Sequence, residues 1–202
     1  IWAHYGCFSA RKRSLAKNII DSRWVLKWKW DIPAVSETTA ANQEGKWIIR
    51  ARLTVRGFKD LEKHTVDRYA GTSLRYSQRI LVSCAAQHGW EIATTDISKA
   101  FLQGVTYEEL SRITGDPCRE VNCTLPAGSE FIIKSVAKFE DFDPSTDVLH
   151  CDKPGTGSLD APRCFSLKLA MVTSRMCNLQ SSSVDPELCF SHDKEGKLTL
   201  VL

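Results

Sequence analysis

The sequence predicts an α+β fold, in which strands and helices are mixed along the chain without strict alternation. Apolar residues recur every second position at 23–31 and 46–58, and with helical spacing at 77–89 and 160–178. The absence of regular strand–helix alternation favours α+β over a doubly wound parallel sheet. With 43% hydrophobic residues in 202, the chain can bury a sizeable core.

Two β-rich runs predict a hairpin with one basic face. In RWVLKWKWD (23–31) and KWIIRARLTVRGF (46–58), basic side chains alternate with aromatic or aliphatic ones. This period of two is typical of strands, and residues 36–45 would form the turn between them. The basic face would carry Lys27, Lys29, Arg50 and Arg52. The opposite face of the first strand would carry Trp24, Leu26, Trp28 and Trp30. We expect the tryptophan rings to pack in the hairpin and the core.

The middle of the chain predicts a helix followed by a strand. SQRILVSCAAQHG (77–89) has a capping Ser77 and a terminating Gly89. WEIATTD (90–96) predicts a strand that ends at Asp96. Taken alone, that carboxylate before ISKAFL is a helix N-cap.

The second half predicts two more helices and a hairpin. YEELSRITG (107–115) is a short acidic helix, and residues 116–157 form a loop-rich stretch. A longer helix over 160–178 begins with Asp160 and Pro162. ELCFS and KLTLVL predict strands joined by the turn HDKEGK.

The composition indicates an intracellular domain without a membrane segment. No apolar run approaches the roughly 20 residues of a membrane helix, and the N-terminus lacks the order of a signal peptide. The eight cysteines include no C-x-x-C, so we expect free thiols. Residues 1–17 are basic and irregular, as in a linker or a polyprotein tail.

Charge is divided unevenly along the chain. Residues 1–80 hold 16 Lys and Arg against 7 Asp and Glu, and the remainder holds 11 against 17. A basic half suits a polyanion, and an acidic half suits cations. A chance partition of solvated charges is the alternative.

Four motifs occur in the order found in copia-type retrotransposon reverse transcriptases, which the chain resembles over about residues 18–202. They are R-W-V-x-K-x-K (23–29), A-R-L-x-V-R-G-F (51–58), T-D-I-S-K-A-F-L-Q-G (95–104) and G-x-x-x-A-P-R-x-F (157–165). The resemblance implies reverse-transcriptase fingers over about 18–89 and a partial palm over about 90–202. It also implies an RNA template, a DNA primer, deoxynucleoside triphosphates and the rest of a Pol polyprotein as partners.

The resemblance implies phosphoryl transfer through two Mg²⁺ ions, which favour carboxylate and carbonyl oxygens. Asp96 corresponds to a catalytic metal ligand, and the backbone carbonyl of Ile97 to a second ligand. Phe101 corresponds to the aromatic beneath the sugar of the incoming nucleotide, where it disfavours a 2′-hydroxyl; an ordinary core Phe is the alternative.

The resemblance also assigns substrate contacts. Lys27, Lys29, Arg50 and Arg52 would contact phosphates, since ammonium and guanidinium groups suit phosphate oxygens; a solvated strand face is the alternative. Gly157, Pro162 and Arg163 would form a loop near the template and the nucleotide. In this motif Asp160 stands where the family has a neutral Gln, which we expect to weaken phosphate contacts.

The family's adjacent Asp pair does not occur in these 202 residues, and the turn and strand that precede it, EGKLTLVL (195–202), close the sequence. We therefore expect this stretch to be catalytically incomplete. The alternative is a non-enzymatic, decayed relic that binds nucleic acid through its basic half. The resemblance places the protein in the cytoplasm, in a virus-like particle, or in the nucleus.

Overall fold

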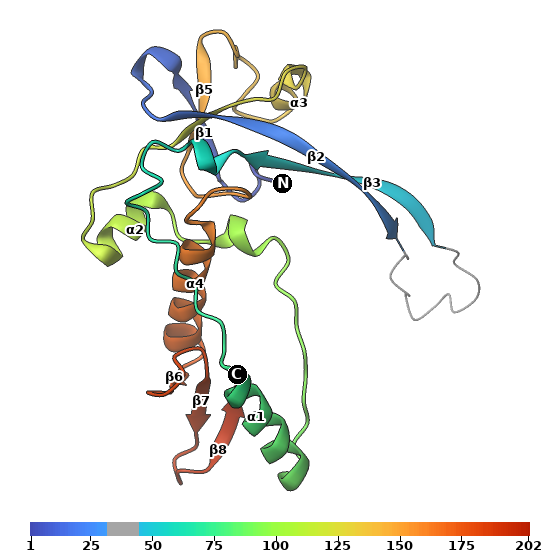
Figure 1. Cartoon of the computed structure of the whole chain (residues 1–202), viewed down its shortest axis with the longest axis vertical. Coiled ribbons are helices and arrows are strands. Elements are labelled where there is room, and N and C mark those ends of the chain that lie inside the picture. The colour runs from blue at the N-terminus through green and yellow to red at the C-terminus, as the bar shows by residue number, and fades with distance from the viewer. Residues whose placement is uncertain (32–44) are drawn as a thin grey trace.

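A mixed five-stranded sheet forms the larger layer of the molecule, as seen in the computed structural model, which describes residues 1–31 and 45–202 (Figure 1). Its strand order is β1-β5-β4-β2-β3, with β2 and β4 parallel and the other neighbours antiparallel. The strands are β1 (Phe8–Lys12), β2 (Ile19–Asp31), β3 (Lys46–Val55), β4 (Asn122–Thr124) and β5 (Asp147–Cys151). Together with the helices below, this sheet confirms the α+β class.

The predicted hairpin is confirmed, and it extends away from the body of the molecule (Figure 1). β2 and β3 pair in antiparallel register from Ser22↔Val55 to Asp31↔Lys46. The predicted turn at 36–45 falls almost wholly on residues 32–44, outside the described part of the chain.

The expectation that the tryptophans pack within the hairpin is confirmed for Trp30 and Trp47, whose rings meet edge to face with centroids 5.4 Å apart. The expectation that they pack in the core is wrong. Trp28 is 68% exposed, and Trp30 is also exposed. A two-stranded ribbon that projects from a sheet presents both of its faces to solvent, so alternation alone could not bury either face.

The prediction that residues 1–17 are irregular is wrong, because they contain β1. This strand pairs with β5 from Phe8↔Cys151 to Lys12↔Asp147. Cys7 and Phe8 are buried, and the Phe8 ring meets Phe139 edge to face with centroids 5.5 Å apart. Burial of these apolar side chains holds the segment against the sheet.

The helix predicted at 77–89 is α1 (Arg75–His88), and Gly89 ends it in the left-handed conformation, with φ +66°. Ser77 lies inside the first turn and is not the N-cap, which corrects the prediction. The Asp185 carboxylate, from a distant loop, accepts hydrogen bonds from the Ser77 hydroxyl and the Leu74 amide, which lower the pKa of Asp185.

The short helix predicted at 107–115 is α2 (Tyr107–Thr114). Thr106 and Glu109 form a reciprocal capping box at its start, and Gly115 ends it. The stretch predicted as loop, 116–157, contains β4, β5 and α3 (Glu130–Lys134). Because β5 pairs with β1 and β4 pairs with β2, segments from both sides of residue 90 contribute to one sheet.

The long C-terminal helix is α4 (Ala161–Met171), which continues as a π-helical turn, η4 (Val172–Met176). It runs from the large sheet to a second, three-stranded sheet, beside which α1 lies (Figure 1). That sheet has the order β6-β7-β8 and confirms the predicted strand pair: β6 (Gln180–Ser181), β7 (Cys189–His192) and β8 (Leu198–Val201). Three short 3₁₀ turns complete the elements: η1 (Arg13–Leu15), η2 (Gly57–Lys59) and η3 (Ala100–Gln103).

All eight cysteines are free thiols, as predicted. Within residues 1–31 and 45–202, no helix combines the length and apolar character needed to cross a membrane.

Candidate nucleic-acid interface

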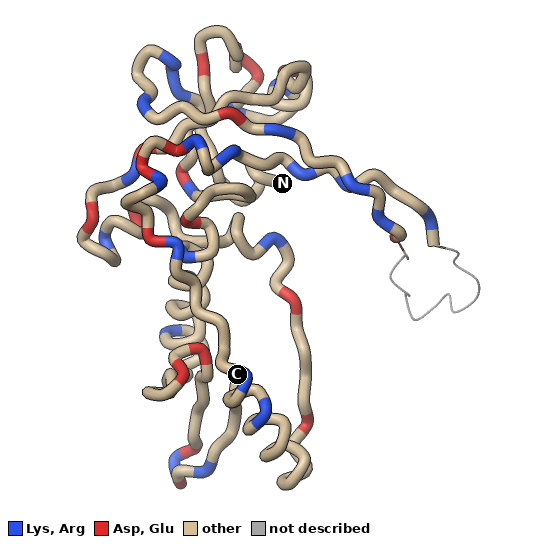
Figure 2. The backbone as a smooth tube through the Cα atoms, viewed as in Figure 1, with Lys and Arg blue, Asp and Glu red and all other residues tan. Residues whose placement is uncertain are grey.

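The four basic residues that the sequence assigned to phosphate contacts share one face of the β2–β3 hairpin. Lys27 pairs directly with Arg50, and Arg52 lies opposite Val25, two positions along the same face. Lys29 follows on the same face and forms an ion pair with Asp31, with 3.2 Å between Nζ and Oδ1. Lys27, Arg50 and Arg52 form no ion pair with any described residue, so this face presents uncompensated positive charge (Figure 2).

A cavity of about 570 Å³ lies along the edge strand β3, where the hairpin joins the body. It brings together Phe101, Arg50 and Arg52, three residues that the sequence assigned to one substrate site. Lys27 and Lys29 lie farther along the hairpin and do not line it. The rest of the lining is mostly apolar and includes Trp2, Trp24, Leu53, Leu102, Leu125, Ile132 and Ile133.

Phe101 is held at this cavity by η3. Its neighbour Leu102 is buried, whereas Phe101 itself is 41% exposed and borders the open space. A side chain added at Gly104 would lie 3.1 Å from backbone and side-chain atoms of Cys164, so η3 packs closely on α4. The Val105 amide donates a hydrogen bond to the Cys164 carbonyl over 3.2 Å. In the T-D-I-S-K-A-F-L-Q-G motif, Leu102 therefore lies in the core and Phe101 lies at the cavity.

Asp96 and Ile97 do not lie where the sequence predicted. The expected strand at 90–96 does not form: this segment is exposed, non-regular chain that connects α1 to η3. Asp96 is exposed, and neither residue lines the cavity. A strand needs a hydrogen-bonded neighbour, and none of the sheets in the described chain includes this segment.

The described residues do not fit a two-metal centre. They contain no group of three or more His, Cys, Asp and Glu side chains that could hold a metal ion. Asp96 belongs to no such group. No catalytic step through Mg²⁺ follows from this geometry.

The loop before α4, residues 156–160, pairs with the end of β3, which places it beside the cavity. The Val55 amide donates to the Thr156 carbonyl over 3.0 Å, and the Gly57 amide donates to the Gly157 carbonyl over 3.2 Å. Gly157 has φ +94°, and a Cβ there would lie 2.1 Å from the Val55 carbonyl oxygen. The glycines of two separate motifs therefore let two backbones meet.

Pro162 and Arg163 lie in the first turn of α4 and do not line the cavity. The Arg163 guanidinium forms an ion pair with Asp67, with 3.3 Å between Nε and Oδ2. Within the described structure, these two residues thus support the loop and do not contact the candidate site.

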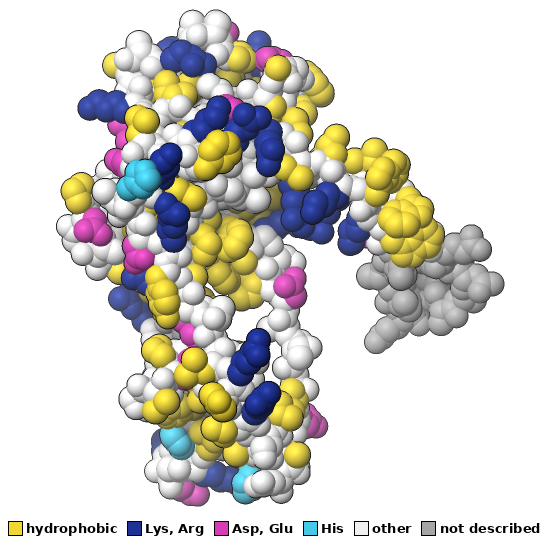
Figure 3. All heavy atoms as spheres, in the orientation of Figure 1, with side chains coloured by type: hydrophobic (Ala, Val, Ile, Leu, Met, Phe, Trp, Pro, Cys, Tyr) yellow, Lys and Arg dark blue, Asp and Glu magenta, His cyan; other side chains and the backbone are white. Residues whose placement is uncertain are grey.

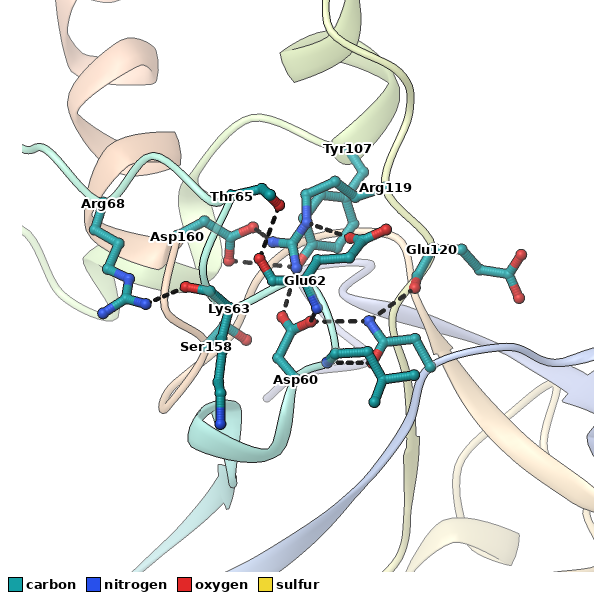
Figure 4. A network of polar contacts seen from close by, with 12 residues as sticks. Asp60, Glu62, Lys63, Thr65, Arg68, Tyr107, Arg119, Glu120, Ser158 and Asp160 are labelled. Atoms are coloured by element: carbon teal, nitrogen blue, oxygen red, sulfur yellow. Dashed lines mark hydrogen bonds and ion pairs between the residues drawn. The ribbon is translucent and has the colours of Figure 1, made fainter.

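Arg119 forms the centre of a polar network that sequence reasoning missed (Figure 4). Its guanidinium contacts Asp60 at 2.5 Å, Glu62 at 2.9 Å and also the Asp160 carboxylate. The Tyr107 ring lies under the guanidinium carbon, 5.5 Å from its centroid. A signal is present in the sequence, because Asp60 follows the R-G-F motif and Asp160 departs from the resemblance, but Arg119 falls in the stretch predicted as loop.

The network also explains Asp160, which was expected to weaken phosphate contacts. Its side chain is 2% exposed and faces Arg119, away from solvent. Burial raises the pKa of Asp160 against the opposing effect of Arg119. For Asp60, burial also favours a higher pKa, but hydrogen bonds from Asn18, the Glu62 amide and Arg119 outweigh it and lower the pKa. The negative charge that Asp160 adds, compared with the neutral Gln of the family, is thus paired with Arg119 inside the fold.

No protein-family model matches this chain. No solved structure matches it either. Its function therefore has to follow from its own motifs and geometry.

Proposed function

We propose that the chain forms the fingers and part of the palm of a copia-type reverse transcriptase, an RNA-directed DNA polymerase. Its substrates would be an RNA template, a DNA primer and deoxynucleoside triphosphates, and its family cofactor would be Mg²⁺. The observation that carries this proposal is the shared cavity: Phe101 of one motif and the arginines of another line the same 570 Å³ space.

The chemistry of the lining suits a nucleoside triphosphate. Arg50 and Arg52 offer forked guanidinium donors for phosphate oxygens, and neither forms an ion pair with a described residue. Phe101 offers an aromatic surface for the sugar. The volume falls within the roughly 300–1,000 Å³ typical of small-molecule sites.

Binding of a fluorescent deoxynucleotide to the 202-residue protein, in the presence of a template–primer duplex, tests this proposal. The double variant Arg50→Gln/Arg52→Gln should weaken binding at least about 10-fold, because neither side chain could then donate a charge-assisted hydrogen bond to phosphate. Arg79→Gln is the matched control, since Arg79 is exposed on α1 and does not line the cavity. Equal affinity for the double variant and the control would contradict the assignment of this cavity.

We expect the 202-residue protein to be inactive in primer extension, because Asp96 is the one carboxylate that the resemblance assigns to the metal ions. Mg²⁺-dependent incorporation by the pure protein would contradict this. An adjacent Asp pair encoded within a few codons after Leu202 would support the polymerase, whereas a stop codon or a disrupted frame would support a decayed element.

One observation favours a second function, nucleic-acid binding without catalysis. Lys27, Arg50 and Arg52 present positive charge that no described residue neutralises. Such a face binds a polyanion even when no reaction follows.

A further inference from the structure

The face of the β2–β3 hairpin opposite the basic residues is a continuous apolar surface, which we call the tryptophan face. The register places four cross-strand pairs on it, and none contains a charged or polar side chain. The pairs are Trp24–Leu53, Leu26–Ala51, Trp28–Ile49 and Trp30–Trp47. Figure 3 shows hydrophobic side chains gathered along the projecting hairpin.

These side chains are exposed to an extent that is unusual for their type. Trp28 and Trp47 are 68% and 63% exposed, and Leu26 and Ile49 are both more than half exposed. At about 200 Å² for each tryptophan side chain, the indole rings present about 400 Å². The two aliphatic side chains bring the face to roughly 600 Å², the upper limit of the largest apolar patch on a typical monomer. A surface of this kind marks an interaction site.

We propose that the tryptophan face binds a second copy of this chain, so that two hairpins pack face to face in a symmetric dimer. An apolar face without charges is complementary to itself, as a two-fold interface requires. Two such faces would together bury about 1,200 Å², the lower limit for a specific, stable protein–protein interface. The proposal does not depend on polymerase activity, although Trp24 and Leu53, at the base of the face, also line the cavity.

The distribution of charge favours a protein partner over nucleic acid on this face. A base-stacking surface combines aromatic rings with cations that follow the phosphate backbone. Here the register places Lys27, Arg50 and Arg52 on the opposite face of the ribbon. Trp24, at the base of the hairpin, lines the cavity together with the two arginines, whereas the three outer tryptophans of the hairpin do not line it. A nucleic acid on the outer part of the tryptophan face would meet indole rings without phosphate contacts.

The same separation keeps the dimer compatible with the basic face. Two sheets that pack face to face lie about 10 Å apart, and the basic faces would point outward on both sides. The charged groups on the two outer faces lie farther apart than the sheets themselves, beyond the Debye length of about 8 Å at physiological ionic strength, so repulsion between the copies is largely screened. Dimerisation should therefore persist, or increase, as salt is added, whereas binding of nucleic acid should weaken.

Sedimentation velocity of the 202-residue protein, from sub-micromolar to tens of micromolar concentration, tests the proposal. We expect a concentration-dependent monomer–dimer equilibrium that added salt does not weaken. The variant Trp28→Thr/Trp47→Thr should raise the dissociation constant at least about 100-fold, because each substitution removes a tryptophan from both sides of a symmetric interface. Thr keeps a high strand preference, and circular dichroism checks that the variant is folded.

Two control variants isolate the face. Met176→Thr/Val184→Thr removes two apolar side chains that are 80% and 81% exposed, at least as exposed as the two substituted tryptophans, but that lie off the hairpin. This variant should dimerise as the unmodified chain does. Lys27→Gln/Arg50→Gln alters the opposite face and should also leave dimerisation intact. In the unmodified chain, a blue shift of tryptophan emission with concentration should follow the sedimentation change without any substitution.

Three outcomes would overturn the proposal. The first is a monomer at every concentration. The second is a dimer that the tryptophan pair of substitutions does not weaken. The third is a folded tryptophan variant that loses affinity for single-stranded oligonucleotides while dimerisation is unchanged, which would make this face a nucleic-acid surface.

Discussion

Arg119 joins three segments that are distant in the sequence, and its charge decides whether their carboxylates can be buried. Its side chain is 13% exposed, and those of Asp60 and Asp160 are 5% and 2% exposed. A buried pair is not itself a strong source of stability, but removal of one partner leaves an uncompensated charge.

Arg119→Met should therefore lower the free energy of unfolding by about 3–5 kcal/mol. Urea denaturation measures this change. Arg112→Met is the control, because Arg112 is exposed on α2 and should change stability little. Addition of Asp160→Asn to Arg119→Met should recover part of the stability, and a strictly additive result would show that the two residues are not coupled.

The lowered pKa of Asp60 predicts a pH dependence of stability. A carboxyl whose pKa is lower in the folded state stabilises the fold above its unfolded value, about 3.9 for Asp, and this stability is lost as the pH falls through the folded pKa. Asp160, with a raised pKa, acts in the opposite direction. Urea midpoints between neutral and acidic pH should therefore fall less steeply in Asp60→Asn than in the unmodified protein. Parallel curves would contradict the assignment.

Phe101 carries the prediction about sugar selection. In a complete enzyme, Phe101→Ala should raise incorporation of ribonucleotides relative to deoxynucleotides, because the ring would no longer occupy the space of a 2′-hydroxyl. Primer extension with each nucleotide type measures the ratio. Phe131→Ala is a control, since Phe131 is exposed on α3 and does not line the cavity. Unchanged sugar discrimination would remove Phe101 from this role.

At the level of secondary-structure elements, the contact between the end of β3 and the loop at 156–160 holds one wall of the cavity, to which Thr156 belongs. The fit depends on Gly157, where both a positive φ and the Val55 carbonyl oxygen exclude a side chain. α4 and η3 hold the facing wall through the Cys164 backbone.

Gly157→Ala should destabilise the protein more than Gly196→Ala. Both glycines have positive φ, at +94° and +80°, but a Cβ at Gly196 meets open space. The shared conformational cost is about 1–2 kcal/mol, so the additional destabilisation at Gly157 measures the cost of disturbing the close backbone approach. Thermal denaturation of the two variants measures the difference, and equal destabilisation would show that the loop moves aside without penalty.

Across the entire fold, the described hairpin at 23–31 and 46–55 carries six basic residues against one acidic residue, Asp31, whereas the body carries many charges of both signs (Figure 2). Lys27, Arg50 and Arg52 form no ion pair with a described residue, whereas several basic side chains of the body do, as Arg119 and Arg163 show. Long-range attraction of a polyanion is therefore directed to the hairpin.

Nucleic-acid binding should accordingly weaken steeply with salt. On a single strand, the slope of the logarithm of the binding constant against log salt concentration is negative. Its magnitude should decrease by about 0.7 for each phosphate that the protein no longer neutralises. Lys27→Gln/Arg50→Gln should therefore reduce it by about 1.4. Fluorescence anisotropy of a labelled oligonucleotide gives the slope. Lys194→Gln/Lys197→Gln, in the turn between β7 and β8, is the control and should leave it unchanged.

Elements whose signals are local could be predicted from the amino-acid sequence alone. Alternation along β2 and β3 predicts both strands and the shared basic face, and Gly89 and Gly115 predict two helix ends. The motif residues Phe101, Arg50 and Arg52 can likewise be named without knowledge of their common cavity.

Features that depend on a distant partner became visible only in the tertiary fold. The segment 90–96 has strand-like residues but no neighbouring strand in the described sheets, and β1 exists because β5 lies beside it. Ser77 does not cap its helix, and Asp185 reaches the same helix end instead. The burial of Asp160 and the exposure of the tryptophans were equally hidden, because periodicity shows which residues share a face but not what lies against it.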